Sequence, residues 1–165
     1  MFQRLAGAVI ATCVSFPVVI LAQGFGTGSP MDYSRLKLKI VRTYTVPELL
    51  PGPSDQKTLT PADMARKGTQ FVVVKLTGTP SEPNMEVRLT SRDCEAKFTT
   101  DKPETVSAIG WDMGGQGLRW QILSSVTWNA GAEPFSFSIV FAVPKEVKKF
   151  EVACNDTSIG VASLP

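Results

Sequence analysis

Apolar and polar side chains alternate with a period of two along most of the chain beyond residue 34. The clearest case is residues 135–143, where the odd positions carry large apolar side chains and the even positions carry Ser, Val or Ala. Residues 35–40 alternate as strictly, with basic side chains on one face and apolar side chains on the other. Such alternation is typical of a β-strand with one buried face. The pattern therefore predicts an all-β fold.

Two further segments predict strands of different kinds. Residues 71–77 form a mostly apolar, β-branched run, which is typical of a central strand buried on both faces. Residues 120–128 alternate again, so we expect one strand in which Trp120 and Trp128 point to the same side.

Helical patterns are short. After a Pro-rich loop, Thr60 can cap a helix that begins at Pro61, and Gly68 can end it. Strands separated by Pro- and Gly-rich turns, with one short helix, predict an immunoglobulin-like antiparallel β-sandwich of about seven to eight strands. A parallel α/β sheet would need long helices between the strands.

The first residues of the chain predict export. Arg4 precedes an apolar run, residues 5–21, and small or polar residues follow it, which is the order of a secretory signal peptide. We expect a signal peptide over residues 1–24 and a flexible N-terminal segment over residues 25–34. Residues 35–165 are then long enough for a single β-sandwich domain.

Two other interpretations of the leader stay open. Its apolar run lies at the short end of what can span a bilayer as an uncleaved anchor, and Cys13 is a candidate for lipidation. Cleavage would leave a secreted or periplasmic protein with no stable membrane span.

Cleavage would also leave two of the three cysteines, Cys94 and Cys154. An even pair in an exported chain predicts one disulfide, here closing a loop of about 60 residues. Alternation places both side chains inward, which suits a bridge inside a β-sandwich.

Three segments resemble one known family. They are residues 67–77 (Lys-Gly-Thr-Gln-Phe-Val-Val-Val-Lys-Leu-Thr), residues 130–137 (Ala-Gly-Ala-Glu-Pro-Phe-Ser-Phe) and residues 141–152 (Phe-Ala-Val-Pro-Lys-Glu-Val-Lys-Lys-Phe-Glu-Val). They are similar to the telokin-like extracellular immunoglobulin-fold domains of bacterial exported proteins, and the Phe-x-Val-Pro-Lys turn is the most distinctive part. The resemblance implies a fold and a location outside the cytoplasm, without an assigned activity.

Composition narrows the function classes. The formal net charge is only +2, whereas nucleic-acid-binding proteins usually have a strong basic excess. The chain contains no histidine, which is the commonest general base and a common zinc ligand. We therefore expect no nucleic-acid partner, no catalytic residues, no metal and no cofactor.

The basic face of residues 35–40 has two interpretations. Its side chains Arg35, Lys37 and Lys39 can contact an anionic polymer. They can equally protect an edge strand from pairing with other chains. The sequence leaves both open.

A Gly-rich segment, residues 110–120, carries the best candidate ligand-binding side chains. They are Trp111, Asp112, Gln116 and Arg119, which combine an aromatic ring for stacking with polar groups. We expect Trp111 to be exposed and Trp120 to lie in the core. The alternative is a long hairpin that closes one end of the sandwich.

Asn155 begins an Asn-Asp-Thr sequon. It is a possible glycosylation site if the organism is eukaryotic and the side chain faces solvent.

These patterns predict an exported, non-catalytic binding or interaction module. The expected partner is an extracellular or envelope protein or a glycan. One alternative is a structural or accessory component of a cell-surface assembly, and a lesser one is a secreted carbohydrate-binding or carbohydrate-acting protein.

Overall fold

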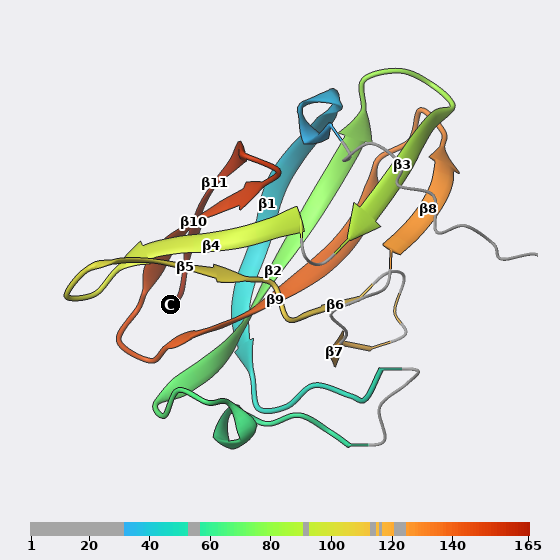
Figure 1. Cartoon of the computed structure of the whole chain (residues 1–165). Coiled ribbons are helices and arrows are strands. Elements are labelled where there is room, and N and C mark those ends of the chain that lie inside the picture. Colours follow the sequence, from blue (N-terminus) through green and yellow to red (C-terminus); the bar gives the residue numbers. More distant parts are fainter. Residues whose placement is uncertain (1–31, 53–56, 91–92, 113–114, 116, 121–124) are drawn as a thin grey trace, which may run out of the picture.

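The computed structural model describes residues 32–52, 57–90, 93–112, 115, 117–120 and 125–165. The expected signal peptide lies outside these residues. In the described part, eleven strands and two short 3-10 helices form a β-sandwich (Figure 1). The expected all-β antiparallel sandwich is confirmed. The expected number of about seven to eight strands is too low, in part because strands of two or three residues are too short to produce an alternating pattern.

The larger sheet contains five strands in the spatial order β1-β2-β9-β6-β7. They are β1 (Leu36–Val46), β2 (Thr69–Pro80), β9 (Phe135–Pro144), β6 (Gly110–Asp112) and β7 (Arg119–Trp120). Each neighbouring pair is antiparallel. Strand β2 lies between β1 and β9, and its residues 71–74 are fully buried. The prediction of a central strand is therefore confirmed, and the expected burial on both faces holds over residues 71–74 but not at Lys75, which is exposed.

The second sheet contains four strands in the order β11-β10-β4-β5. They are β11 (Thr157–Ser163), β10 (Lys149–Cys154), β4 (Cys94–Thr99) and β5 (Pro103–Ser107). In Figure 1, β4 and β5 cross β1, β2 and β9 at a steep angle, as in orthogonal sheet packing.

Strands β3 (Met85–Thr90) and β8 (Ser125–Ala130) form a separate two-stranded ladder. The prediction of one strand over residues 120–128 is therefore wrong, since β7 and β8 belong to different sheets. A run of alternating residues does not indicate where a strand leaves one sheet for another.

The main core lies between the two large sheets. Strand β2 contributes its even positions from Val72 to Leu76, and β9 contributes its odd positions. Opposite them, Phe150 and Val152 point inward from β10. The rings of Phe141 and Phe150 meet edge to face, with 5.8 Å between their centres.

A smaller apolar cluster lies on the outer face of the five-stranded sheet. Its buried members are Leu49, Phe71, Val73 and Val140. Leu59 and Met64, from the Pro-rich segment, pack against them. The segment over residues 47–64 thus covers part of this outer face.

The predicted helix begins as expected. Thr60 and Asp63 form a capping box around η2 (Pro61–Asp63). However, η2 is a single 3-10 turn that ends at Asp63, and the expected end at Gly68 is wrong. Gly68 instead has a φ of +73° before β2, a conformation that favours glycine.

An ordered turn precedes β1. In η1 (Tyr33–Arg35), the Asp32 side chain accepts a hydrogen bond from the Ser34 amide. The Tyr33 side chain is only 1% exposed. Residues 32–34, which we expected to be flexible, thus form an ordered turn, and the rest of the expected flexible segment lies outside the described residues. Among the described residues, no helix is long and apolar enough to cross a membrane.

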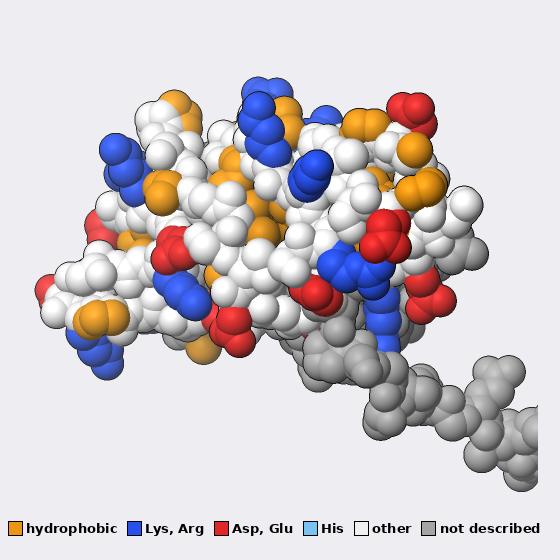
Figure 2. Space-filling model, turned by 90° about the horizontal axis from the view of Figure 1, so that it is seen from above, with side chains coloured by type: hydrophobic (Ala, Val, Ile, Leu, Met, Phe, Trp, Pro, Cys, Tyr) orange, Lys and Arg blue, Asp and Glu red, His pale blue; other side chains and the backbone are white. Residues whose placement is uncertain are grey.

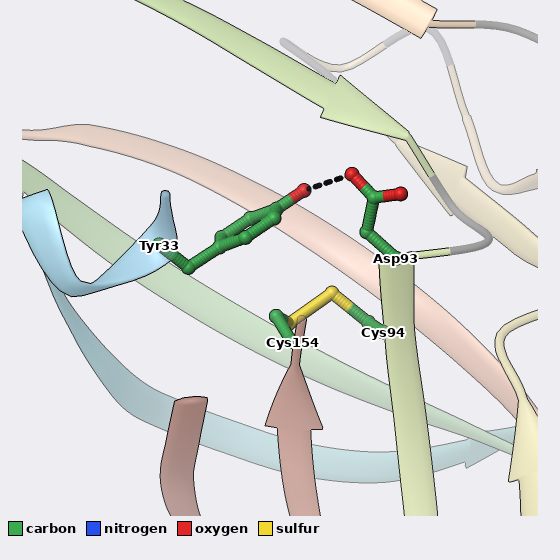
Figure 3. Close-up of a disulfide and its surroundings, with 4 residues drawn as sticks. All are labelled: Tyr33, Asp93, Cys94 and Cys154. Carbon is green, nitrogen blue, oxygen red and sulfur yellow. Dashed lines mark hydrogen bonds between the residues drawn. A yellow bond between two sulfur atoms is a disulfide. The ribbon is translucent and has the colours of Figure 1, made fainter. Parts of the chain in front are cut away.

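A disulfide joins Cys94 and Cys154 beside this turn (Figure 3). The two cysteines are directly opposite each other on β4 and β10, with Cα atoms 4.0 Å apart. Both are buried. The bridge therefore links neighbouring strands of one sheet and does not cross between the sheets.

Tyr33 and Asp93 form a polar contact next to the disulfide. The Tyr33 hydroxyl donates a hydrogen bond of 3.0 Å to the Asp93 carboxylate (Figure 3). Burial, and secondly the charge of Asp93, raise the pKa of Tyr33 far above its usual range. Burial also raises the pKa of Asp93, while the hydrogen bond from Tyr33 partly opposes this.

The disulfide should contribute a large part of the stability. By the chain-entropy model, a bridge with a sequence separation of 60 residues stabilises the fold by about 4 kcal/mol. We expect Cys94→Ala/Cys154→Ala to lower the free energy of unfolding by this order, measured by urea titration with tryptophan fluorescence. A reductant should weaken the wild type and leave the variant unchanged. Equal transition midpoints for the oxidised wild type and the variant would contradict this.

Tyr33 should make stability fall as the pH rises above about 10. The unfolded chain ionises this hydroxyl near pH 10, whereas its raised pKa keeps it protonated in the folded protein. The contribution is therefore complete below pH 10 and declines above it by up to about 1.4 kcal/mol per pH unit. We expect Tyr33→Phe to give a flatter dependence of unfolding free energy on pH between 9 and 11.

The readout is the slope, because Tyr33→Phe also removes a hydrogen bond from Asp93 and lowers stability at neutral pH. Tyr44→Phe, which changes the other tyrosine, is the control and should keep the alkaline decline that Tyr33 causes. A Tyr33→Phe slope identical to that of the wild type would refute the assignment.

Candidate functional site

The outer face of the five-stranded sheet has a covered part and an open part. Strand register determines which side chains share it, because directly opposite residues of an antiparallel pair point to the same face. Phe71 and Val73 mark the part covered by residues 47–64. Beyond them, from Lys75 onward, β2 presents polar residues. We call this part the open face; its side chains are Lys37, Lys39, Arg42, Lys75, Thr77, Thr79, Ser136 and Ser138.

The open face forms three registered rows across the strands. Lys37 is opposite Thr79 in the first row. Lys39, Thr77 and Ser136 form the second row. Arg42, Lys75 and Ser138 form the third, and Asp112 on β6 extends it.

A β-bulge brings Arg42 onto this face. Between Ile40 and Arg42 the register shifts by one residue, and the extra residue, Val41, is 56% exposed. Strict alternation from Lys37 and Lys39 would have pointed residue 42 toward the core. Its guanidinium instead lies over the Tyr44 ring, 5.1 Å from the ring centre.

The four cations of the open face have no acidic partner in the described part of the chain. Lys37, Lys39, Arg42 and Lys75 are all exposed. The ion pairs that occur elsewhere are Arg35–Glu82, Lys57–Asp63, Arg66–Glu104 and Arg66–Glu146. Among the described residues, no carboxylate therefore forms an ion pair with the positive charge of the open face.

Hydroxyl groups lie between these cations. Thr77 and Thr79 are half-buried, Ser136 is exposed and Ser138 is 8% exposed. Residues 37–41 with Thr77 and Thr79 line an open depression of about 660 Å³. The arrangement offers both positive charge and hydrogen-bonding groups on one face of the sheet.

The outer face of the four-stranded sheet has a different charge pattern from the open face. Lys97 is directly opposite Glu151 on the neighbouring strand, and Glu95 and Lys149 are on the same face. Acidic and basic groups thus alternate there. In Figure 2, basic side chains project at the middle of the upper border, whereas most acidic side chains lie lower in the view.

Both ends of the segment over residues 110–120, β6 and β7, are strands where we expected a loop with an exposed Trp111. Trp111 is on β6 opposite Ile139, so it points toward the inner side of the sheet and is half-buried. The Trp111 indole nitrogen and one Asp112 carboxylate oxygen are buried, with no hydrogen-bond partner in the described structure. The expectation of an exposed Trp111 is therefore wrong.

Arg119 and Trp120 are attached to the covering segment. The Arg119 guanidinium donates to the Pro51 carbonyl at 2.8 Å, and the Trp120 indole donates to the Lys57 carbonyl at 2.9 Å. Trp120 packs on the smaller apolar cluster, not in the main core. Gln116 lies outside the described residues. A ligand-binding role for the four candidates, Trp111, Asp112, Gln116 and Arg119, stays a prediction. One of them, Arg119, already stabilises the fold through its hydrogen bond to Pro51.

Asn155 occupies the tight turn between β10 and β11. Asn155 and Asp156 both have positive φ, as in a two-residue hairpin turn. The Asn155 backbone N–H donates a hydrogen bond of 2.8 Å to the Asp93 backbone carbonyl, and Asn155 is half-buried. Glycosylation there stays a prediction.

Two parts of the open face were not predicted from the sequence, for different reasons. Lys75, Thr77 and Thr79 are odd positions of β2, and the change from apolar to polar odd positions after Val73 is visible in the sequence. Arg42 depends on the bulge, which no residue pattern indicates. Among the described residues, no group of three His, Cys, Asp or Glu side chains is placed to hold a metal ion.

No protein-family model matches the sequence, and no curated protein matches it. A solved structure that resembles it is that of an uncharacterized β-sandwich protein from Clostridium difficile 630, with a TM-score of 0.45 and 14% sequence identity over 79% of this chain and 87% of the other.

Proposed function

We propose that this chain is an exported, non-catalytic binding module whose ligand contacts the open face. The observation that carries the proposal is the set of four exposed cations that have no acidic partner in the part of the chain that the structure describes. The pairing of β1 with β2 fixes where the backbones of these four residues lie, and ordering their long side chains on binding costs part of the binding free energy.

Export is supported by the leader pattern and by the disulfide. Disulfides persist in oxidising compartments and are rare in the cytosol. The bridge between Cys94 and Cys154 is buried, which suits a structural role.

Binding fits the chemistry of the open face better than catalysis does. Ammonium and guanidinium groups attract anions, but acid–base catalysis needs a positioned proton acceptor near the reacting group. The carboxylate in register with the open face, Asp112, is two strands away from Lys75.

A structural role in an assembly is the second candidate. Strand β11 is an edge of the four-stranded sheet, and Val161 on it is 63% exposed. An unpaired edge with an exposed apolar residue favours pairing with another chain. Self-association that depends on protein concentration and is lost in Val161→Lys would support this alternative.

The proposal is tested by a pull-down with matched variants. The face variant carries Lys37→Gln, Lys39→Gln and Lys75→Gln. The control variant carries Lys97→Gln, Lys148→Gln and Lys149→Gln on the other sheet and its adjoining turn, so both lose the same charge. The oxidised wild type is immobilised against envelope and medium extract, and bound proteins and sugars are identified by mass spectrometry.

We expect one dominant ligand to be retained by the wild type and the control variant and lost by the face variant. Equal thermal unfolding of the two variants would verify that both are folded. A ligand that both variants retain equally would place the binding site elsewhere.

A further inference from the structure

We infer that the ligand of the open face is an extended anionic polysaccharide. This inference rests on the proposed function and adds the chemical class of the ligand. It follows from the spacing of the cations and from the hydroxyl groups between them. It also follows from the absence, among the described residues of this face, of an apolar anchor and of exposed aromatic rings for stacking.

The cations form an array and not a pocket. Lys37 and Lys39 are on the same face of β1, two residues apart, which places their Cα atoms about 6.5–7 Å from each other. Arg42 and Lys75 are opposite each other on adjacent strands. The array therefore runs along β1 and widens onto β2. A small anion would contact one or two of these groups, whereas an extended polymer can contact all four.

The hydroxyl groups fit sugar units. Thr77, Thr79 and Ser136 lie beside the cations in the registered rows. A hydroxyl group both donates and accepts hydrogen bonds, as do the hydroxyls of a sugar. A polymer with separated charges and hydroxyls between them matches a face that has separated cations and hydroxyls between them.

The composition of the face is unfavourable for a protein partner. The cores of protein–protein interfaces are depleted in Lys and Ser and enriched in aromatic residues, Met and Arg, and the open face has three Lys and two Ser against one Arg. Val41, at the bulge, is a large exposed apolar side chain, and it lies at the border of the open face. An aromatic or aliphatic anchor for a protein partner is missing from the described residues of this face.

The face is also unfavourable for nucleic acid. Single-stranded nucleic acids are bound by exposed aromatic rings on which bases stack. The aromatic ring bordering the open face, Tyr44, is half-buried and has Arg42 above it. A formal net charge of +2 gives little long-range attraction for such a highly charged polymer.

Each exposed contact is weak, so the binding should depend on several contacts at once. Exposed ion pairs are individually small and are screened by salt, but linked contacts add through effective concentration. We therefore expect binding that weakens steeply as the salt concentration rises.

The experiment uses the full oxidised chain and defined polymers. Hyaluronate and polygalacturonate, whose carboxylates are separated by sugar hydroxyls, are the anionic polysaccharide probes, dextran is the neutral one, and poly-glutamate and single-stranded poly(dT) are the other polyanions. Affinity is measured by biolayer interferometry at 50, 150 and 500 mM NaCl. We expect binding to at least one anionic polysaccharide, no binding to dextran and weaker binding to the other polyanions.

The variants locate the site. We expect the face variant to bind the anionic polysaccharide about tenfold or more weakly than the wild type, and the control variant to bind within about twofold of it. Equal losses in both variants would overturn the inference, since the attraction would then be general. Binding that 500 mM NaCl leaves unchanged would overturn it as well.

The outcomes separate this inference from the proposed function. If no polysaccharide binds while the pull-down yields a protein that needs the open face, the ligand class is wrong and the binding module stands. Tighter binding of poly-glutamate or poly(dT) than of both anionic polysaccharides would also overturn the ligand class. If neither experiment gives a ligand that depends on the open face, both proposals fail.

Discussion

The structure depends on one constraint, which is the burial of β2 on both faces over residues 71–74. Its even positions require cover from the four-stranded sheet, and Phe71 and Val73 require cover on the opposite side. Burial of a side chain of this size stabilises a fold by about 1.5–3 kcal/mol. The segment over residues 47–64 provides the second cover. Where the odd positions become polar at Lys75, that cover is no longer required, and the sheet face is open.

The Gly-rich segment helps to hold this cover in place. The Leu50 amide donates to the Leu118 carbonyl, and the Trp120 amide donates to the Leu50 carbonyl. Gly110 allows the close approach, since a Cβ atom there would lie 2.7 Å from the Arg119 carbonyl oxygen. Of the four candidate ligand-binding residues, Arg119 thus helps to fasten the covering segment to the edge of the sheet, while the open face lies on the other part of that sheet.

Much of the fold could be predicted from alternation, but the topology and the site could not. The strand over residues 71–77, the inward cysteines and the capping box at Thr60 are local features, and each is present. The change of sheet between Trp120 and Ser125 and the burial of Trp111 depend on contacts with distant segments. Arg42 joins the open face through a bulge, which is a property of strand pairing. Only Lys37 and Lys39 of the four cations were visible as a row in the sequence.

The small net charge of the chain conceals an uneven distribution. On the four-stranded sheet, Lys97 has Glu151 directly opposite it, so the two charges largely cancel. On the open face, the row of Arg42, Lys75 and Ser138 reaches a carboxylate only at Asp112, on the fourth strand. A chain can therefore be nearly neutral and still present a local positive field, because the field at short range depends on the nearest charges and salt screens those beyond about 10 Å. For this reason, the small net charge can argue against a strongly charged partner while the open face still attracts a sparsely charged polymer.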